Sequence, residues 1–148
     1  MATQMGTPAA DLPAELAGLP PCDQVGLVVR DLERAMAMYA PLFGPFTTMD
    51  GSVQQASYRG RLADVGLKIA YGRSGDLEIE LIEWTGGESP HREFIEAGRE
   101  GMHHFRFRVD DTDHWVEKLR PLGYEAIWYK RWSADTVFAY LERAGDPT

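Results

Sequence analysis

The stretch QVGLVVRDLERA, residues 24–35, carries the signature of a strand that runs into a helix. The segment 24–29 reads as a strand, and Asp31 stands where a helix cap is expected. Apolar residues then recur at helical spacing as far as Phe43, and Gly44 ends the pattern. The same unit recurs as HFRFRV, residues 104–109, followed by Asp111 and a second amphipathic segment that stops at Gly123.

Each of these units leads into further expected strands. They lie at 46–49, 54–58, 67–71 and 77–84 in the first copy, and at 124–129 and 136–141 in the second. Gly75-Asp76 precedes the full strand LEIELIEW, whereas Gly145-Asp146 precedes only Pro147-Thr148. The last strand of the second copy is therefore expected to be absent, either because the chain is cut short or because another chain fills the gap.

This repeat predicts an α+β fold of paired β-α-β-β-β modules, because four strands and one helix cannot bury both sheet faces alone. We expect curved mixed sheets around a cleft, with the helices outside. The expected divisions are a flexible leader over 1–20, a first module over 21–85, a linker with a short helix over 86–101 and an incomplete second module over 102–148.

Composition narrows the class of protein. The 148 residues carry a formal net charge of −8, which argues against nucleic acid or an anionic membrane as a partner. A single cysteine, Cys22, excludes an intramolecular disulfide framework and a cysteine zinc site, and it is expected to be inert. No apolar run approaches the ~20 residues that span a bilayer. We expect a cytoplasmic protein.

Strand alternation brings three polar residues to one face. Gln24, Glu80 and His104 all project away from the expected helix layer, while Phe105 and Phe107 are expected beneath the second helix. Amide, carboxylate and imidazole groups suit zinc or another divalent ion such as cobalt, nickel, manganese or magnesium. Each residue also has an ordinary interpretation: a hydrogen-bonded or exposed histidine, a solvated glutamate and plain polar alternation at the glutamine.

The same alternation of side chains along the strands gives further candidate site residues. Arg106 shares the face of His104 and is expected to meet a substrate anion, or else to pair with Glu78 or Glu80. An aromatic wall for substrate binding, or simple core packing, is expected from Tyr58, Tyr71, Trp84, Trp128 and Tyr140. The remaining histidines, His91 and His114, are expected to be solvated on helix surfaces.

The motifs resemble those of the vicinal oxygen chelate superfamily, which contains glyoxalases, bleomycin-resistance proteins and extradiol dioxygenases. The resemblance lies in DQVGLVV at 23–29, DLERA at 31–35 and IELIE at 79–83. The run of Ser89-Pro90, Phe94-Ile95, Gly98 and GMHH at 101–104, with Val109-Asp110, resembles methylmalonyl-CoA epimerases.

The resemblance implies a metal site with one ligand from the first and last strand of each module. These positions fall on Gln24, Glu80 and His104, with His103 as the alternative register, and the fourth would lie on the absent strand. Epimerases and bacterial glyoxalases usually carry histidine at the position of Gln24, whereas animal-type glyoxalase I carries glutamine. The family also implies a homodimer.

The resulting functional expectation is a metal-dependent isomerase or lyase of the epimerase and glyoxalase branch. It would act on a small carbonyl compound, such as a thioester or a 2-oxo acid derivative, by proton transfer through a metal-stabilised enolate. Glu80 is the one catalytic base that the sequence names. The alternatives are a metal-free drug- or metabolite-binding protein of the bleomycin-resistance type, or a metal-free natural-product enzyme.

Overall fold

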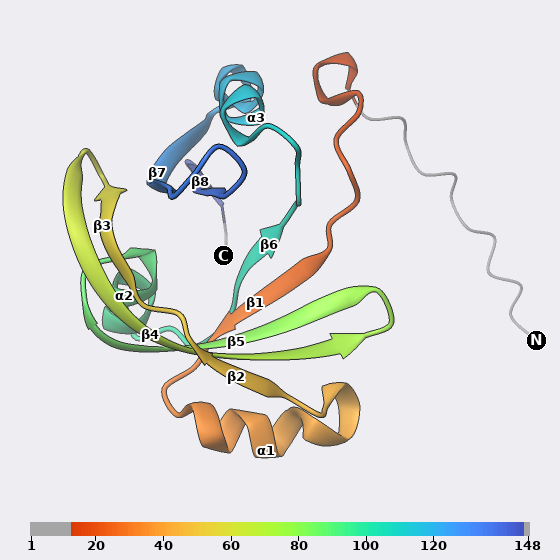
Figure 1. Ribbon diagram of the computed structural model, residues 1–148, viewed down its shortest axis with the longest axis vertical. Helices are drawn as coiled ribbons and strands as arrows, with labels where there is room; N and C mark the ends of the chain where they lie inside the picture. Colours follow the sequence, from red (N-terminus) through yellow and green to blue (C-terminus); the bar gives the residue numbers. More distant parts are fainter. Residues whose placement is uncertain (1–12, 147–148) are drawn as a thin grey trace, which may run out of the picture.

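A single mixed sheet of eight strands organises the chain, and the computed structural model describes residues 13–146 of it (Figure 1). The fold is the α+β fold expected from the sequence, with a curled, half-barrel sheet. The elements are η1 (Ala14–Leu16), β1 (Gln24–Val28), α1 (Leu32–Phe43), β2 (Thr47–Asp50), β3 (Val53–Tyr58), β4 (Arg61–Ser74), β5 (Leu77–Gly87), α2 (Pro90–Glu96), β6 (Gly101–Arg106), α3 (Thr112–Leu119), η2 (Arg120–Leu122), β7 (Tyr124–Arg131) and β8 (Val137–Arg143).

The strand order is β6-β1-β5-β4-β3-β7-β8, with β2 pairing alongside β4. Strand β1 pairs in parallel with β5 and antiparallel with β6, so it lies inside the sheet. A short pairing of Ser57 and Tyr58 with Tyr129 and Trp128 joins β3 to β7 and links the two modules at the other end. Strands β6 and β8 end the sheet, and each pairs on one side only among the described residues.

The convex face of the first module is covered by α1, which lies beneath β2, β4 and β5 in Figure 1. The Asp31 side chain caps this helix by accepting from the Arg34 backbone N–H at 3.1 Å, and Gly44 follows its last turn. Val25 and Leu27 pack on this side with Leu32, whereas Val28 is buried on the opposite face. The predicted alternation along β1 is thus confirmed.

A second apolar cluster lies on the concave face of the sheet. It contains Val28, Val53, Ala56, Tyr58, Ala63, Val65, Leu67, Ile69, Ile82, Phe94 and Trp128. Phe94 belongs to α2, so this helix packs against the concave-face cluster. Its N-terminus is capped by Ser89, whose hydroxyl accepts from the His91 backbone N–H at 3.2 Å.

The second module is covered less completely than the first. Asp111 caps α3, as expected, but no residue of α3 is buried. Phe105 and Phe107 were expected beneath this helix and are instead 60% and 43% exposed. The reason is that β6 ends at Arg106 and α3 packs against β7 and β8 instead of β6.

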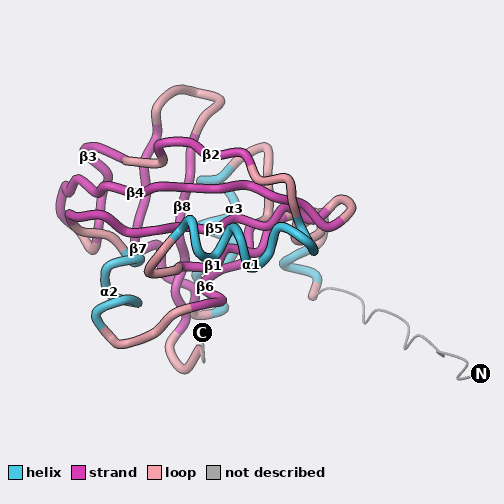
Figure 2. Tube along the Cα trace, turned by 90° about the horizontal axis from the view of Figure 1, so that it is seen from below, coloured by secondary structure: helices cyan, strands magenta, loops and turns pink. Residues whose placement is uncertain are grey.

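The start of the expected leader, residues 1–12, lies outside the described residues. Within the rest of the leader, Ala14–Leu16 forms one 3₁₀ turn. Across residues 13–146, none of the helices combines the length and the apolar character that crossing a bilayer requires. Figure 2, seen from below, shows α1 running along the strands that it covers.

Candidate functional site

The middle of the sheet brings together the three polar residues that strand parity placed on one face. In the register of β1, Gly26 is paired with Glu80 of β5 on one side and with His104 of β6 on the other. Gln24 lies two residues earlier on the same face of β1. The three side chains therefore come from three adjacent strands and meet above Gly26.

Gly26 makes room for this arrangement. A Cβ atom built at Gly26 would lie 2.1 Å from Cε1 and 2.3 Å from Nε2 of His104. The imidazole consequently lies directly against the backbone of β1, which any side chain at this position would prevent. The role of Gly26 depends on a cross-strand register that the sequence of one strand alone does not reveal.

The polar atoms of the three residues lie close to one another. His104 Nε2 is 3.2 Å from Gln24 Oε1 and 3.5 Å from Glu80 Oε1. Gln24 Nε2 donates to Glu78 Oε1 at 2.6 Å and to Glu80 Oε2 at 3.3 Å, which turns the amide oxygen toward His104. Gln24 is 2% exposed and Glu80 is 7% exposed, so both lie almost entirely out of solvent.

These spacings suit a bound divalent ion. Nitrogen and oxygen ligands that lie about 2.0–2.3 Å from an ion are separated from one another by roughly 3 to 3.5 Å. Among residues 13–146 no three His, Cys, Asp or Glu side chains gather closely enough to hold a metal ion. A metal at this position would therefore need the amide oxygen of Gln24 as well as Glu80 and His104.

A row of three histidines runs from the interior to this cluster. The expectation that His91 is solvated is wrong, because its side chain is 0% exposed. Its Nδ1 lies 2.9 Å from Ser89 Oγ, its Nε2 lies 3.3 Å from the Tyr140 hydroxyl, and its ring stacks on His103 at 5.2 Å. The helix that carries His91 lies on the concave side, which its short sequence did not indicate. His114, in contrast, is exposed as expected.

Burial keeps the inner two histidines neutral. It lowers the pKa of His103 to about 3, with the neighbouring His104 acting in the same direction. Burial also lowers the pKa of His91 well below its usual value, again with His103 and His104 contributing. The Nδ1 atoms of His103 and His104 lie 3.0 Å apart, so the two rings share one hydrogen bond.

Two tyrosines complete the surroundings of Glu80. Tyr71 of β4 is the cross-strand partner of Glu80 in the sheet. Tyr140 holds the equivalent position in β8 under the sequence repeat, and its ring lies 5.0 Å from that of His104. Burial, together with the charge of Glu80, raises the pKa of both tyrosines well above its ordinary value. The site thus contains two repeat-related pairs, Gln24 with His104 and Tyr71 with Tyr140.

The other aromatic residues that were expected to bind substrate belong to the core or its edge. Trp128 and Tyr58 are buried in the concave cluster, and Trp84 packs against it with its indole N–H donating to the Gly87 carbonyl at 3.2 Å. Tyr58, Trp84 and Trp128 therefore show core packing, which was the alternative interpretation from the sequence. Contact with a substrate is still a prediction for all five aromatic residues.

Arg106 is held by carboxylates beside the cluster. Its guanidinium donates to both oxygens of Asp23, at 2.9 and 3.1 Å, and to Glu78 Oε1 at 3.3 Å. The ion pair with Glu78 was one of the two interpretations from the sequence, and it is confirmed. The pairing with Asp23 was not anticipated, and contact of Arg106 with a substrate anion stays a prediction.

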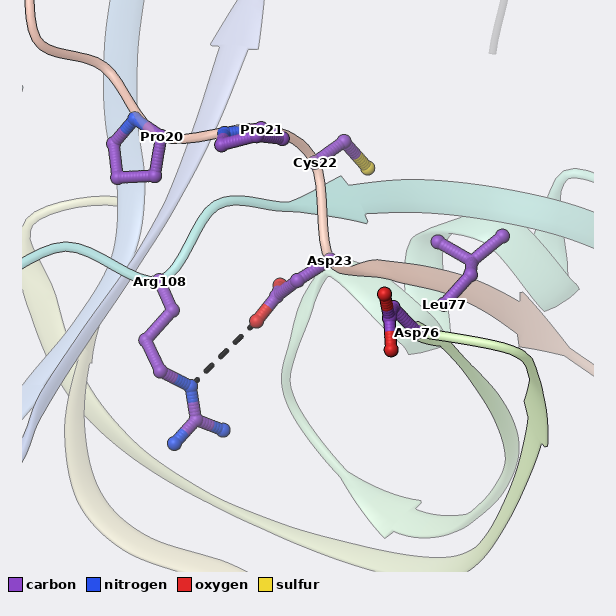
Figure 3. Close-up of a pocket in the computed structure, with 7 residues that line it drawn as sticks. All are labelled: Pro20, Pro21, Cys22, Asp23, Asp76, Leu77 and Arg108. Atoms are coloured by element: carbon purple, nitrogen blue, oxygen red, sulfur yellow. Dashed lines mark ion pairs between the residues drawn. The ribbon is translucent and has the colours of Figure 1, made fainter.

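Two hollows lie near these residues. The larger, about 480 Å³, is lined by Pro20, Pro21, Cys22, Asp23, Asp76, Leu77 and Arg108. Figure 3 shows Arg108 reaching across it toward Asp23, with 3.6 Å between Nε and the carboxylate. The smaller hollow, about 300 Å³, lies between α2, β6 and β8, and its lining includes His103, His104 and Tyr140. It is the smaller hollow that opens onto the polar cluster.

Comparisons with known proteins point in one direction. Human mitochondrial methylmalonyl-CoA epimerase is 28% identical over 109 residues, and the mouse enzyme is 28% identical over 110. Each match covers 70% of this chain and 57% of the relative, so the chain spans little more than half the length of these curated relatives.

Solved structures share the fold. A hypothetical protein from Bacillus halodurans superimposes with a TM-score of 0.59 at 21% identity, covering 82% of this chain and 83% of that one. Methylmalonyl-CoA epimerase from Streptomyces coelicolor, in complex with 2-nitronate-propionyl-CoA, gives 0.57 at 22% identity, with 84% and 85% covered. The epimerase from Mycobacterium tuberculosis gives 0.55 at 19% identity, with 90% and 84% covered.

The sequence profile of one family extends over most of the chain. It matches residues 23–140, from the residue before β1 to the Tyr140 position in β8, and so includes every member of the polar cluster. This protein belongs to the glyoxalase/bleomycin resistance protein/dioxygenase superfamily, and it is distantly related to methylmalonyl-CoA epimerase.

Proposed function

We propose that the protein is a metal-dependent isomerase or lyase that moves a proton next to the carbonyl group of a small substrate. The observation that carries the proposal is the approach of Gln24 Oε1 and Glu80 Oε1 to His104 Nε2, at 3.2 and 3.5 Å. Members of this superfamily often bind metals, and the ligand types present suit a divalent ion.

In this proposal each residue of the cluster has a specific role. Gln24, Glu80 and His104 would hold the ion, which would supply positive charge beside a substrate carbonyl oxygen as negative charge develops there. The amide of Gln24 is oriented for this by its hydrogen bonds to Glu78 and Glu80. His104 is seated against Gly26, and so its ring needs no reorganisation.

Glu80 would also be the base in this proposal, acting as a ligand of the ion and as a base at different moments. A carboxylate beside the substrate carbonyl can remove the proton from the adjacent carbon, and isomerisation then requires that a proton return to the opposite face of that carbon or to the neighbouring carbon. Tyr71 is the cross-strand partner of Glu80, and burial together with the charge of Glu80 raises the pKa of both Tyr71 and Tyr140. The concave apolar cluster excludes water from the far side of these groups.

The substrate class we propose is a small acyl thioester or a 2-oxo acid derivative. The solved Streptomyces coelicolor epimerase binds 2-nitronate-propionyl-CoA, which supports a thioester. The hollow of about 300 Å³ beside His104 and Tyr140 has the size of a small-ligand pocket. An acyl group entering there would meet the polar cluster at its open side.

Metal analysis and proton exchange test the proposal together. Purified protein is expected to carry about one divalent ion and to exchange the α-proton of methylmalonyl-CoA or propionyl-CoA with deuterium, followed by proton NMR. His104→Ala is expected to lose both properties, while the exposed His114→Ala retains them. Full exchange activity in a metal-free His104→Ala protein would refute the proposal.

A metal-free binding protein of the bleomycin-resistance type is the second candidate. It is favoured by the absence of any three clustered His, Cys, Asp or Glu side chains within residues 13–146. Here Gln24 and His104 would simply hydrogen-bond to each other and the hollow would hold an apolar ligand. Protein that contains no metal and shows no exchange, but whose tryptophan fluorescence responds to drug-like aromatics, would favour it.

A metal-free natural-product enzyme is a third possibility from the sequence, and turnover that persists after treatment with a chelator would point to it. The homodimer and the cytoplasmic location are further predictions of this proposal. Light scattering of the purified protein and cell fractionation check them.

A further inference from the structure

We propose that Arg59 is a positioning residue that sets the width of the smaller hollow and so limits the substrate to a short acyl group. This role rests on the proposed function, because it concerns the same site. Arg59 lies in the turn between β3 and β4, outside the polar cluster. Its role follows from the two carboxylates that its side chain joins and from the backbone that carries it.

The guanidinium of Arg59 bridges a helix and a strand that are far apart in the sequence. It donates to both carboxylate oxygens of Glu93 in α2, at 2.6 and 2.9 Å, and to both oxygens of Glu142 in β8, at 3.3 and 2.8 Å. The Tyr58 hydroxyl also donates to Glu93. Single surface ion pairs contribute little, but an arginine that binds two carboxylates with several hydrogen bonds fixes their geometry. Arg59 therefore holds α2 and β8 at a defined separation.

Both of these carboxylates line the smaller hollow, to which α2 also contributes Phe94 and β8 contributes Leu141. The same two elements meet a second time in the interior, where His91 Nε2 lies 3.3 Å from the Tyr140 hydroxyl. The hollow, about 300 Å³, is at the small end of the range of ligand pockets. A tie between two of its walls therefore limits how far they can separate around a ligand.

Strand β8 is the wall that depends most on this tie. Among the described residues it pairs with β7 alone, so it is an edge strand, and Glu142 and Arg143 at its end are exposed. On α2, in contrast, Pro90, His91 and Phe94 are buried. A strand end with few buried contacts opens more readily than a helix anchored by buried side chains. Loss of the Arg59 guanidinium should therefore let the end of β8 move away from α2 and widen the hollow.

The backbone at Arg59 is unusual for an arginine. Arg59-Gly60 is the two-residue loop of the hairpin in which Tyr58 pairs with Arg61, and its φ angles are +47° and +85°. Such loops favour Asn-Gly or Asp-Gly, because few other residues adopt a left-handed backbone without strain. Strain of this kind persists where the surrounding structure holds it. At Arg59 the two ion pairs do so, together with the backbone N–H, which donates to the Ile127 carbonyl at 2.9 Å.

Titration calorimetry with propionyl-CoA and hexanoyl-CoA tests the width of the hollow. The wild type is expected to bind hexanoyl-CoA about tenfold more weakly, because the longer chain does not fit between the tied walls. Arg59→Asn suits the turn but removes the guanidinium, and it should bind the two thioesters within about twofold of each other. The matched control is Arg61→Gln in the same hairpin. It removes an exposed ion pair with Glu88, which does not line the hollow, and should keep the wild-type preference.

Glu142→Ala separates the tie from its charge. The substitution removes the β8 end of the bridge and also one negative charge from the lining. If Arg59 acted only by offsetting negative charge, Glu142→Ala would bind both anionic thioesters more tightly and in the wild-type ratio. A tie between the walls predicts instead that Glu142→Ala loses the preference for propionyl-CoA, as Arg59→Asn does. A merely structural role would change the stability of the protein and leave the ratio of the two affinities unchanged.

The outcomes distinguish the role of Arg59 from the proposed function. Wild-type protein that binds the thioesters without exchanging the α-proton removes the proposed function, and the affinity ratio in Arg59→Asn still decides the role of Arg59. Exchange in the wild type, together with an unchanged ratio in Arg59→Asn, removes only the role of Arg59. If Arg59→Asn fails to fold, the ratio in Glu142→Ala decides.

A measurement without any ligand covers the remaining case, in which the wild type binds neither thioester and the proposed substrate class fails. Hydrogen–deuterium exchange of the backbone amides at 141–143 reports the opening of β8 directly. These amides should exchange faster in Arg59→Asn than in Arg61→Gln. Equal exchange rates in the two variants would overturn the tie.

Discussion

The two modules begin with the same strand–helix unit, yet they are completed differently. In the first, β1 is paired on both sides and α1 covers β4 and β5. In the second, β6 is paired on one side only, and α3 has no buried residue. The difference follows from β5, which has no counterpart in the second module among the described residues.

A helix layer needs a strand beneath it to have something to bury. Strand β5 supplies Ile79 and Leu81 to the cluster under α1, and Glu83 of β5 accepts from the Leu32 backbone N–H at 2.8 Å. In the second module no described strand equivalent to β5 lies beneath α3, which packs against β7 and β8 without burying a residue. Amphipathic periodicity therefore predicted both helices correctly, but it could not predict how much either would bury.

The largest effect that sharpens this contrast is expected at Leu32, which is 5% exposed in α1. Leu32→Ala should destabilise the protein by about 3 kcal/mol, because it removes buried apolar atoms and leaves a cavity. The same change at Leu119 of α3, which is only half-buried, should cost about 1 kcal/mol. Urea unfolding of the two variants measures the difference, and equal losses would contradict the unequal burial of the two helices.

Much of the fold was predictable because local patterns determine it. Asp31 and Asp111 cap their helices, Gly44 and Gly123 end the two helical segments, and most strands lie close to their predicted positions. Strand β6 is an exception, because it runs from Gly101 to Arg106, whereas 104–109 was predicted. The prediction for β4 covered 67–71, whereas the strand runs from Arg61 to Ser74. Its ends contain exposed polar residues, and they are strand only because β3 and β5 pair with them.

The alternation of side chains along each strand predicted part of the candidate site. Gln24, Glu80 and His104 share a face because side chains alternate along each strand. His91 and Gly26 could not be assigned in this way. Burial of His91 depends on which side of the sheet α2 covers, and the role of Gly26 depends on the register between β1 and β6. Both are properties of the assembled sheet rather than of any one segment.

The dependence of stability on pH is the next largest effect, and it concerns the helix between the modules. The folded protein keeps His91 neutral, whereas the unfolded chain protonates it below a pKa of about 6.5. The stabilising contribution is therefore complete above pH 6.5 and is lost as the pH falls below it. The free energy of unfolding should fall by up to about 1.4 kcal/mol per pH unit from this residue, or about 2 kcal/mol between pH 6.5 and 5.

Chemical unfolding at several pH values measures this slope. His91→Asn should flatten it, even where the variant is less stable throughout, while His114→Gln should leave it unchanged. His103 contributes in the same direction, because burial also lowers its folded-state pKa, so the slope of His91→Asn should not reach zero. An unchanged slope in His91→Asn would show that His91 is not held neutral in the fold.

A smaller effect is expected at Gly26, where β1 pairs with β6, the first strand of the second module. Gly26→Ala places a methyl group against the His104 ring and should push the imidazole away from Gln24 and Glu80. We expect Co²⁺ or Zn²⁺ to bind about tenfold more weakly, equivalent to about 1.4 kcal/mol. Gly86→Ala in β5, where nothing lies within 4 Å of the new Cβ, is the matched control. Titration calorimetry compares them, and equal affinity would separate His104 from the metal site.

The smallest effect is expected on the outer face of β6, where the second module is least covered. Phe105 alternates with His104 and corresponds by the repeat to Val25, which packs in the cluster beneath α1. Because Phe105 is 60% exposed, Phe105→Ser should change the free energy of unfolding by no more than about 0.5 kcal/mol. Val25→Ser at the equivalent position should cost several times more, because it removes apolar atoms packed in that cluster. A large loss in Phe105→Ser, measured at low protein concentration by urea unfolding, would mean that this face is covered in solution and that the contrast between the modules is smaller than their packing indicates.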